Sequence, residues 1–176
     1  RQNSYRLLAG EVPARETIVR SAQGLDVIPA SQNLLTITSG RGSARRLRQA
    51  LEPIRNDYDI CFIDTPTAGE LQYNALMAST GVVIPLQTDT YNIQSLYQIA
   101  DVVAQIQKSN PAVEIEGAVI TKYEGHTNIA KQLRAAIEAN AAEMGIPVLG
   151  AIRKGIAVVE AASLQKSLLL STVPRL

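Results

Sequence analysis

One aspartate and the loop after it are the part of this 176-residue sequence best suited to chemistry. Asp64 follows the apolar run ICFI, and Thr65, Pro66 and Gly69 come soon after it. A carboxylate at the end of a buried strand is costly unless a cation, a donor or water lies close to it. Mg²⁺ prefers oxygen ligands and keeps several waters when it bridges to phosphates, so Asp64 suits a water-mediated magnesium contact. The loop would then lie close enough to sense a terminal phosphate, with Pro66 stiffening it.

A purely structural role for Asp64 is the alternative. Aspartate is common as a helix N-cap and in turns. A strand that ends in aspartate also occurs in α/β folds of every function. The residues around Asp64 alone leave both interpretations open.

The elements that must position this loop can be predicted from hydrophobic periodicity. Short apolar or β-branched runs predict strands at residues 25–30, 58–65, 81–87, 113–121 and 147–152. Helical spacing of apolar residues predicts helices at residues 43–57, 70–79, 92–109 and 127–145. In the third helix one buried face is marked by Ile93, Leu96, Ile99, Ala100 and Val103.

This alternation of strands and helices predicts an α/β fold. Parallel neighbours need crossover connections of helix length, so we expect a doubly wound, mostly parallel sheet with helices on both faces. The near-continuous apolar runs ICFI and GVVIPL fit strands that are buried on both faces. No repeat or linker interrupts the pattern, so residues 1–176 are expected to form a single domain with ligands at the carboxyl ends of the strands.

Composition excludes several other classes of protein. Seventeen basic and sixteen acidic residues give a charge of +1, so nucleic acid or an anionic membrane would need a local basic patch. Cys61 is the only cysteine, which excludes an internal disulfide and favours the reducing cytoplasm. The tail leucines Leu164 and Leu168 to Leu170 form a segment too short for a membrane-lying helix, and it contains Pro174, so no membrane partner is expected.

Several motifs in order carry a resemblance to a known family. The stretch DYDICFIDTPTAGELQYNALMASTGVVIPLQTDTYNIQSLYQIADVV, followed by NPAVEIEGAVITKYEGHTNIAKQLRAAI, resembles the central part of ParA/Soj-type chromosome or plasmid partition ATPases. These are deviant Walker A P-loop proteins of the MinD/ParA superfamily. The resemblance begins near LLAGEVPARETIVRSAQGLDVIPASQNL, continues through IRKGIAVVEAASLQKSLL and covers nearly the whole chain. It implies a P-loop NTPase-like fold with ATP and Mg²⁺ as cofactors.

The resemblance also implies roles for individual residues. Asp64 corresponds to the catalytic Walker B-like aspartate that acts on the magnesium shell, and residues 65–69 correspond to the switch loop that responds to the γ-phosphate. Thr121 and Lys122 correspond to positions near the adenine ring, and Arg153 begins a second stretch, residues 153–157, that flanks the base. Further matches to family positions are Asn74, Pro85 and Gln87.

In this family, basic residues of the C-terminal region bind DNA without sequence preference, and such contacts make affinity strongly salt-dependent. The corresponding candidates here are Lys122, Lys131, Arg134, Arg153 and Lys154. Ordinary solvated surface charge is the alternative for each of them. The resemblance further implies a homodimer, a centromere-binding ParB-type partner and a nucleoid-associated, cytoplasmic location.

One family motif does not occur in these residues. The family holds phosphates with a glycine-rich loop of the form K-G-G-x-G-K-S/T, whose amides and lysines surround them. The early glycine-rich stretch TSGRGSARR, residues 38–46, has no such ending, and we interpret it as a loop before a helix capped by Ser43. We therefore expect the chain to correspond to the C-terminal two-thirds of the family domain, either as a fragment or as a naturally shortened relative.

Without that loop the chain alone is expected to bind ATP poorly and to be inactive as an ATPase, because positioning and charge neutralisation supply most phosphoryl-transfer catalysis. The resulting open sheet edge would favour dimerisation or strand exchange. Two alternatives stay open: a non-hydrolysing ParA-like interaction module, and a MinD-like or cobyrinate-synthase-like relative.

Overall fold

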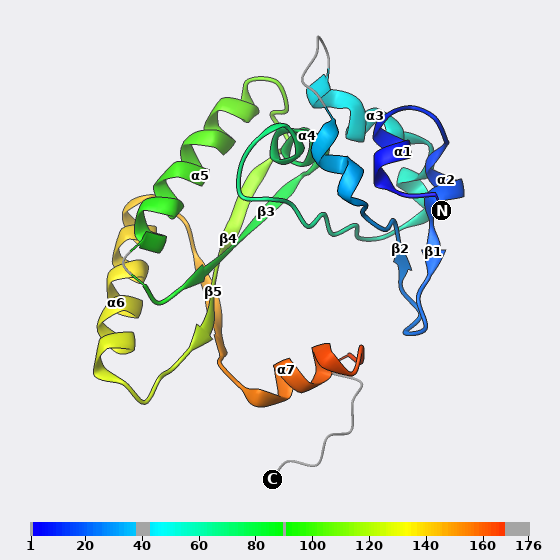
Figure 1. Ribbon diagram of the computed structural model, residues 1–176. Coiled ribbons are helices and arrows are strands. Elements are labelled where there is room, and N and C mark those ends of the chain that lie inside the picture. Colours follow the sequence, from blue (N-terminus) through cyan, green and yellow to red (C-terminus); the bar gives the residue numbers. More distant parts are fainter. Residues whose placement is uncertain (1, 38–42, 90, 168–176) are drawn as a thin grey trace. The chain divides into compact units, whose positions relative to one another are not determined.

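The computed structural model describes residues 2–37, 43–89 and 91–167 (Figure 1). Part of the glycine-rich stretch, residues 38–42, and the tail leucines at 168–170 lie outside the described residues. The chain divides into two compact units. Unit 1 contains residues 1–80 and 106–113, and unit 2 contains residues 81–105 and 114–176. The single domain expected from the sequence stays a prediction.

Unit 2 is built around a three-stranded parallel sheet in the order β3-β4-β5. The strands are β3 (Gly81–Gln87), β4 (Glu114–Tyr123) and β5 (Val148–Arg153). The crossover helices are α5 (Tyr91–Gln107) and α6 (Asn128–Glu143), and the short helix α7 (Ile156–Ser163) follows β5. Because parallel strands are joined here by helices, the predicted α/β fold class is confirmed.

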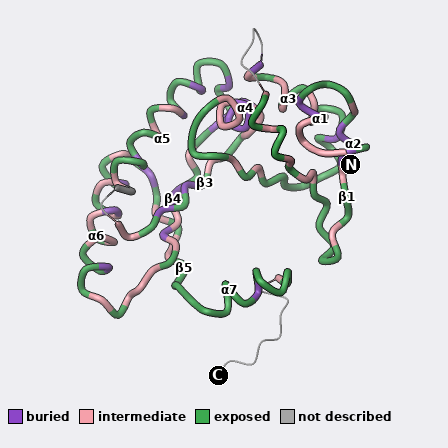
Figure 2. Tube along the Cα trace, in the orientation of Figure 1, coloured by how far each residue is buried: buried purple, intermediate pink, exposed green. Residues whose placement is uncertain are grey.

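Side chains from the sheet, α5 and α6 form the core of unit 2 (Figure 2). Leu96 of α5 and Ile137 of α6 are fully buried, as is Ile120 of β4. The buried face predicted for α5 is confirmed, since Leu96 and Val103 are buried. On the sheet, Val83 and other apolar side chains that alternate with the core residues are about half exposed. The crossover helices α5 and α6 therefore cover one face of this sheet, and the expected helices on the other face stay a prediction.

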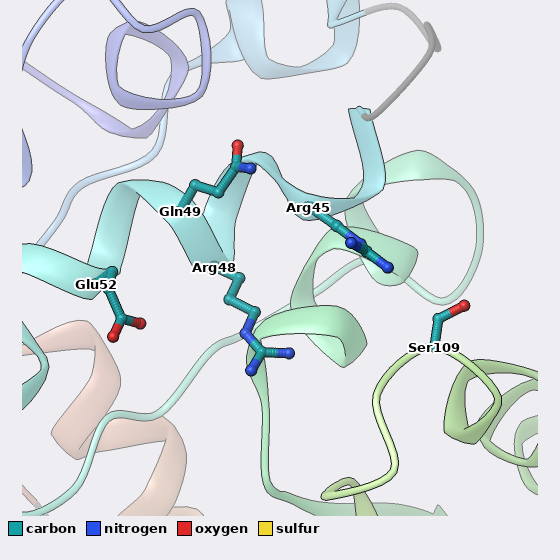
Figure 3. Close-up of a pocket in the computed structure, with 5 residues that line it drawn as sticks. All are labelled: Arg45, Arg48, Gln49, Glu52 and Ser109. Carbon is teal, nitrogen blue, oxygen red and sulfur yellow. The ribbon is translucent and has the colours of Figure 1, made fainter.

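Unit 1 is mainly helical. Its first elements are α1 (Ser4–Leu8), α2 (Ala14–Thr17), β1 (Val19–Arg20), β2 (Asp26–Val27) and the 3₁₀ helix η1 (Gln32–Thr36). They are followed by η2 (Ser43–Arg45), α3 (Arg46–Leu51), η3 (Glu52–Asp57) and α4 (Glu70–Ala78). A small core of Leu7, Ala14 and Ile54 holds α1 and α2 against η3. A hollow is lined by α3 and its two flanking 3₁₀ helices together with Ser109 (Figure 3).

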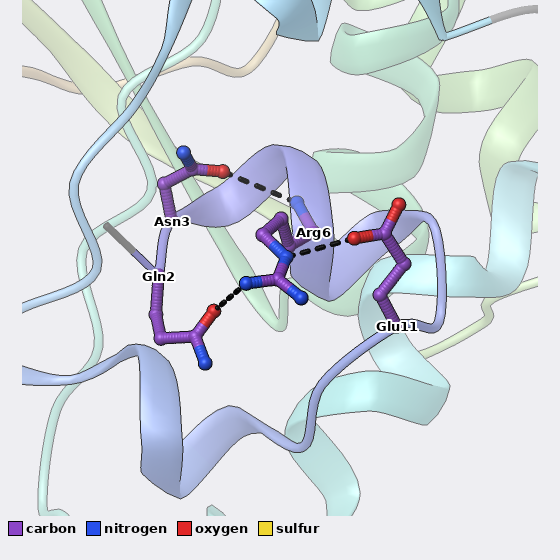
Figure 4. A network of polar contacts seen from close by, with 4 residues as sticks. All are labelled: Gln2, Asn3, Arg6 and Glu11. Atoms are coloured by element: carbon purple, nitrogen blue, oxygen red, sulfur yellow. Dashed lines mark hydrogen bonds and ion pairs between the residues drawn. The ribbon is translucent and has the colours of Figure 1, made fainter.

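The first helix is fixed by polar contacts at its start (Figure 4). Asn3 is the N-cap of α1, and its side-chain oxygen accepts a hydrogen bond from the Arg6 amide at 3.2 Å. The Arg6 guanidinium donates to Gln2 at 2.6 Å and forms an ion pair with Glu11 at 2.8 Å. These contacts stabilise the start of a helix of only five residues, which would be marginally stable by itself.

The prediction of a strand at residues 58–65 is wrong. This segment is not assigned to a strand, and none of the described strands pairs with it. Ile60 and Phe62 are 70% and 90% exposed, so the expected burial on both faces is also wrong. A strand requires a hydrogen-bonded neighbour, and β3 pairs with β4 on one side while no described segment pairs on its other side.

Two other elements differ from prediction. The strand predicted at residues 25–30 is reduced to β2, which pairs antiparallel with β1 in a short hairpin outside the parallel sheet. The helix predicted at residues 43–57 is divided into η2, α3 and η3. Pro53 lies where α3 changes to η3, and because proline lacks an amide donor, it cannot continue the hydrogen bonds of α3. Ser43 begins η2, whereas the N-cap of α3 is Arg45, so Ser43 does not cap that helix.

Across the described residues, no helix combines the length and the apolar character that crossing a membrane requires.

Candidate functional site

The three parallel strands of unit 2 end at a common edge. Gln87 at the end of β3 is in register with Thr121 of β4, and Tyr123 of β4 is in register with Arg153 of β5. The Thr121 hydroxyl donates a hydrogen bond to the Leu86 carbonyl at 3.0 Å, which ties the ends of β3 and β4 together. The structure thus brings Thr121, Lys122 and Arg153 to the edge where ligands bind in open parallel sheets.

Lys122 has an unusual backbone conformation at this edge. Its φ is 52°, in the left-handed region that residues other than glycine seldom adopt. Such strain persists only where the surrounding structure maintains it, and it is concentrated at ligand sites. The side chain of Lys122 is exposed. The conformation therefore fits a lysine that is presented to a ligand.

Two of the basic candidates in unit 2 already have acidic partners. Lys154 forms an ion pair with Glu124, and its hydrogen bond to the Glu124 carboxylate holds the pKa of that group below its ordinary value. Arg134 forms an ion pair with Glu138 at 2.7 Å, which raises the pKa of the guanidinium. Arg134 also lies over the Tyr123 ring, 5.4 Å from its centre. These contacts partly satisfy both cations.

The other three basic candidates form no ion pair with a described carboxylate. Lys122, Lys131 and Arg153 are exposed, and no carboxylate of the described residues lies within ion-pair distance of them. Lys131 lies in the first turn of α6, which is capped by the Thr127 hydroxyl at the Ala130 amide. The basic candidates without an ion pair to a described carboxylate are therefore distributed over β4, β5 and the start of α6.

The Asp64 loop belongs to unit 1. Asp64 is exposed at the end of an extended segment, and α4 begins further on with Gly69 as its N-cap. Gly69 has a φ of 94°, a conformation that favours glycine. Since Gly69 occupies the N-cap position of α4, Asp64 is not the N-cap of this helix. Within the residues that the structure describes, no three His, Cys, Asp or Glu side chains gather as metal ligands.

Asn74 connects α4 to α3. It is 1% exposed, and its side-chain oxygen accepts a hydrogen bond from the Leu47 amide at 3.2 Å. Its side-chain nitrogen donates to the Glu70 carbonyl at 3.1 Å. The asparagine that matches the family position therefore acts inside unit 1 by fastening two helices to each other.

Sequence reasoning missed a second buried asparagine. Asn110 is 3% exposed and donates to the carbonyls of Leu76 at 2.9 Å and Ser79 at 2.8 Å. These carbonyls lie at the C-terminal end of α4, where helical partners run out. An asparagine before a proline, as in Asn110 and Pro111, is a known turn signal, but it gives no indication of which helix end the side chain will reach.

Comparison with known proteins gives the same family as the resemblance in the sequence. The AAA domain family matches residues 1–115 of the chain. The chromosome partitioning protein ParA of Caulobacter vibrioides is 34% identical over 180 residues, which cover 97% of this chain and 66% of that protein. The sporulation initiation inhibitor protein Soj of Bacillus subtilis is 36% identical over 119 residues, covering 64% of this chain and 47% of that protein.

Solved structures show the same fold at lower identity. McdA of Cyanothece superimposes with a TM-score of 0.82 at 19% identity, covering 96% of this chain and 70% of McdA. Cobyrinic acid a,c-diamide synthase of Mycobacterium smegmatis, solved with ADP and magnesium, gives a TM-score of 0.76 at 23% identity and covers 93% of this chain and 74% of the synthase. At these identities the likeness shows the fold alone.

The fold and these relatives define a P-loop-type α/β protein, and the chain belongs to the ParA/Soj family of partition ATPases. It spans slightly less than two thirds of the Caulobacter relative and about half of the Bacillus relative.

Proposed function

We propose that this chain is the nucleotide-switch and DNA-binding portion of a ParA-type partition ATPase. The observation that carries the proposal is the common edge of β4 and β5, where Lys122 and Arg153 are exposed and have no acidic partner in the described structure. In the whole protein, ATP with Mg²⁺ between two subunits would stabilise a dimer that binds DNA without sequence preference. A centromere-binding ParB-type partner would stimulate hydrolysis and release the dimer from the nucleoid in the cytoplasm.

The nucleotide-responsive residues would be Asp64 and the loop after it. The exposed carboxylate of Asp64 is suited to hold a water of a magnesium shell, which is the chemistry that oxygen ligands offer this ion. Thr65 and Pro66 lead to Gly69, the N-cap of α4, so a change in the loop would act on the start of that helix. Thr121, Lys122 and Arg153 would flank the base. A solved plasmid partition protein of Borrelia burgdorferi, bound to AMPPNP, supports a nucleotide role for this fold.

The chain alone is predicted to bind ATP weakly, because its 176 residues contain no Gly-Lys-Ser/Thr loop to surround the phosphates. Isothermal titration of the chain with ATP and magnesium should show no binding in the micromolar range. Asp64→Ala is the matched control, since heat that persists in this variant does not come from the proposed magnesium contact. A micromolar dissociation constant for the unaltered chain would contradict this prediction.

The proposed DNA binding predicts an affinity that falls steeply as salt is raised, and a separate contribution to this slope from each basic residue. Binding to a fluorescent duplex is measured by anisotropy between about 50 and 200 mM salt. Lys122→Gln, Lys131→Gln and Arg153→Gln should each make the slope of log affinity against log salt shallower by about 1, because each removes one phosphate contact. Glu124→Gln should strengthen binding by releasing Lys154 from its ion pair.

Lys166→Gln is the charge-matched control, since this exposed lysine lies after α7 and outside the strand edge. If the control changes the slope as much as the other three variants, the contacts are unspecific and the assignment to the strand edge fails. Absence of duplex binding by the unaltered chain would instead favour the small-molecule chemistry of the cobyrinic acid a,c-diamide synthase fold relative.

A further inference from the structure

We propose that unit 1 carries a phosphate-binding site formed by Arg45 and Arg48. These arginines line a hollow of ≈ 500 Å³ together with Gln49, Glu52 and Ser109 (Figure 3). The hollow lies within unit 1 and contains none of the nucleotide or DNA residues proposed above. It is a second site for phosphate groups, and its existence does not depend on the proposed function.

The charge of the segment that forms this hollow is strongly positive. Residues 43–55 contain four arginines and one acidic residue in a chain whose total charge is only +1. Arg45 is the N-cap of α3, and Arg48 lies three residues further on, within that helix. Figure 3 shows the Arg45 side chain extending toward the segment that carries Ser109, while the Arg48 side chain extends from α3 in a different direction. Arg45 and Arg48 are the two arginines of this segment that line the hollow.

Neither arginine is neutralised by the structure around it. No carboxylate of the described residues lies within ion-pair distance of Arg45 or Arg48. Glu52 lines the same hollow, four residues after Arg48, where an ion pair could have formed along the helix. Two guanidinium groups thus line one hollow without a carboxylate partner, and a bound anion would be attracted to both.

The hollow has two walls, α3 and the turn that contains Ser109, and buried asparagine side chains attach both to α4. Asn74 accepts from the Leu47 amide and so fixes the start of α3, between the two arginines. Asn110 donates to two carbonyls at the end of α4 and so fixes the turn that contains Ser109. Since both asparagines are buried, the positions of the two walls are set before any ligand arrives. The backbone of the site is therefore organised before binding, and only the exposed side chains have to be ordered by the ligand.

The chemistry of the lining residues selects a phosphate group. The planar guanidinium group matches two phosphate oxygens at once, and Ser109 and Gln49 can add neutral donors. The ligand could be free inorganic phosphate or a phosphodiester of a nucleic acid backbone, which offer the same oxygens to the arginines. Two probes, pyrophosphate and a DNA duplex, separate these two sources.

The test uses the double variant Arg45→Gln with Arg48→Gln. Pyrophosphate binding is followed by NMR of the arginine side chains, and duplex binding by anisotropy at two salt concentrations. We expect the double variant to lose at least tenfold in affinity for the probe that uses the site. For the duplex, the slope of log affinity against log salt should become shallower by about 2. Glu52→Gln should tighten binding of the same probe, because it removes the one negative charge in the hollow.

Arg55→Gln is the matched control, since Arg55 is exposed on η3 and does not line the hollow. Loss of pyrophosphate binding alone identifies a free phosphate ligand, and loss of duplex binding identifies a nucleic acid backbone. The proposal is overturned if the double variant binds both probes normally, or if Arg55→Gln has an equal effect. Lys131→Gln tests the strand-edge residues separately, because it should weaken duplex binding and leave pyrophosphate binding unchanged.

Discussion

Replacement of Asn110 with alanine is expected to lower the free energy of unfolding by about 1–3 kcal/mol, because it leaves buried carbonyl groups without a donor. The Asn110 side chain donates to the carbonyls of Leu76 and Ser79, which end α4. The side chain is 3% exposed, so water cannot easily replace it. Urea denaturation followed by circular dichroism measures the loss.

Two further variants show whether hydrogen bonding is the cause. Asn110→Asp keeps the shape of the side chain, but its carboxylate cannot donate, so at neutral pH the loss should exceed that of Asn110→Ala. Asn56→Ala removes an exposed asparagine of η3 and should change stability by less than about 0.5 kcal/mol. If Asn110→Asp were as stable as the unaltered chain, the hydrogen bonds to α4 would not carry the stability.

Gly117→Ala should lower stability by about 2–4 kcal/mol, since it combines backbone strain with a collision inside the sheet. Gly117 has a φ of 152°, and it occupies the position where the register of β4 against β3 shifts. A Cβ there would lie 2.6 Å from the Pro147 carbonyl oxygen, to which the Ala118 amide donates. The collision would disturb the pairing of β4 with β5, and thereby the edge that presents Lys122.

Gly150→Ala is an unusually close control for this prediction. Gly150 lies in β5 with a φ of 155°, nearly equal to that of Gly117, yet a Cβ at this position would meet nothing within 4 Å. It therefore measures the backbone strain alone, which should amount to about 1–2 kcal/mol. Equal losses in both variants, measured by thermal unfolding, would show that the close approach at Gly117 is unimportant.

The sequence predicted unit 2 well because its elements have strong and local signals. β3 has the predicted bounds, and α5 and α6 differ from prediction by one or two residues at each end. The α5 positions at three- and four-residue steps bury Leu96 and Val103 as expected. Both helices are long and amphipathic, and such elements are the ones that periodicity identifies most reliably.

The segment before Asp64 could not be predicted in this way. Its β-formers show a preference for extended structure, and the segment has no helical residues. A strand, however, is defined by its neighbours, and no described segment pairs with residues 58–65. Apolar composition therefore indicated a buried strand where the structure has Phe62 90% exposed.

Some site residues could likewise be placed from local sequence signals, and others could not. Thr121, Lys122 and Arg153 could be placed at a common edge because parallel strands end together. The partners of Lys154 and Arg134 were not predictable, since Glu124 reaches Lys154 from a different strand end and Glu138 could equally have pointed to solvent. The roles of Asn74 and Asn110 depend on contacts 27 to 34 residues away in the chain, for which the local sequence has no signal.

NMR titration of the labelled chain with a short DNA duplex is the most direct test of the central claim that the carboxyl-terminal edge of the unit 2 sheet meets DNA. Amide shifts should change at Lys122, Lys131 and Arg153, and these changes should fade together as salt is raised, because phosphate contacts are screened. A duplex that binds while the amides of these three residues stay unchanged would contradict the account.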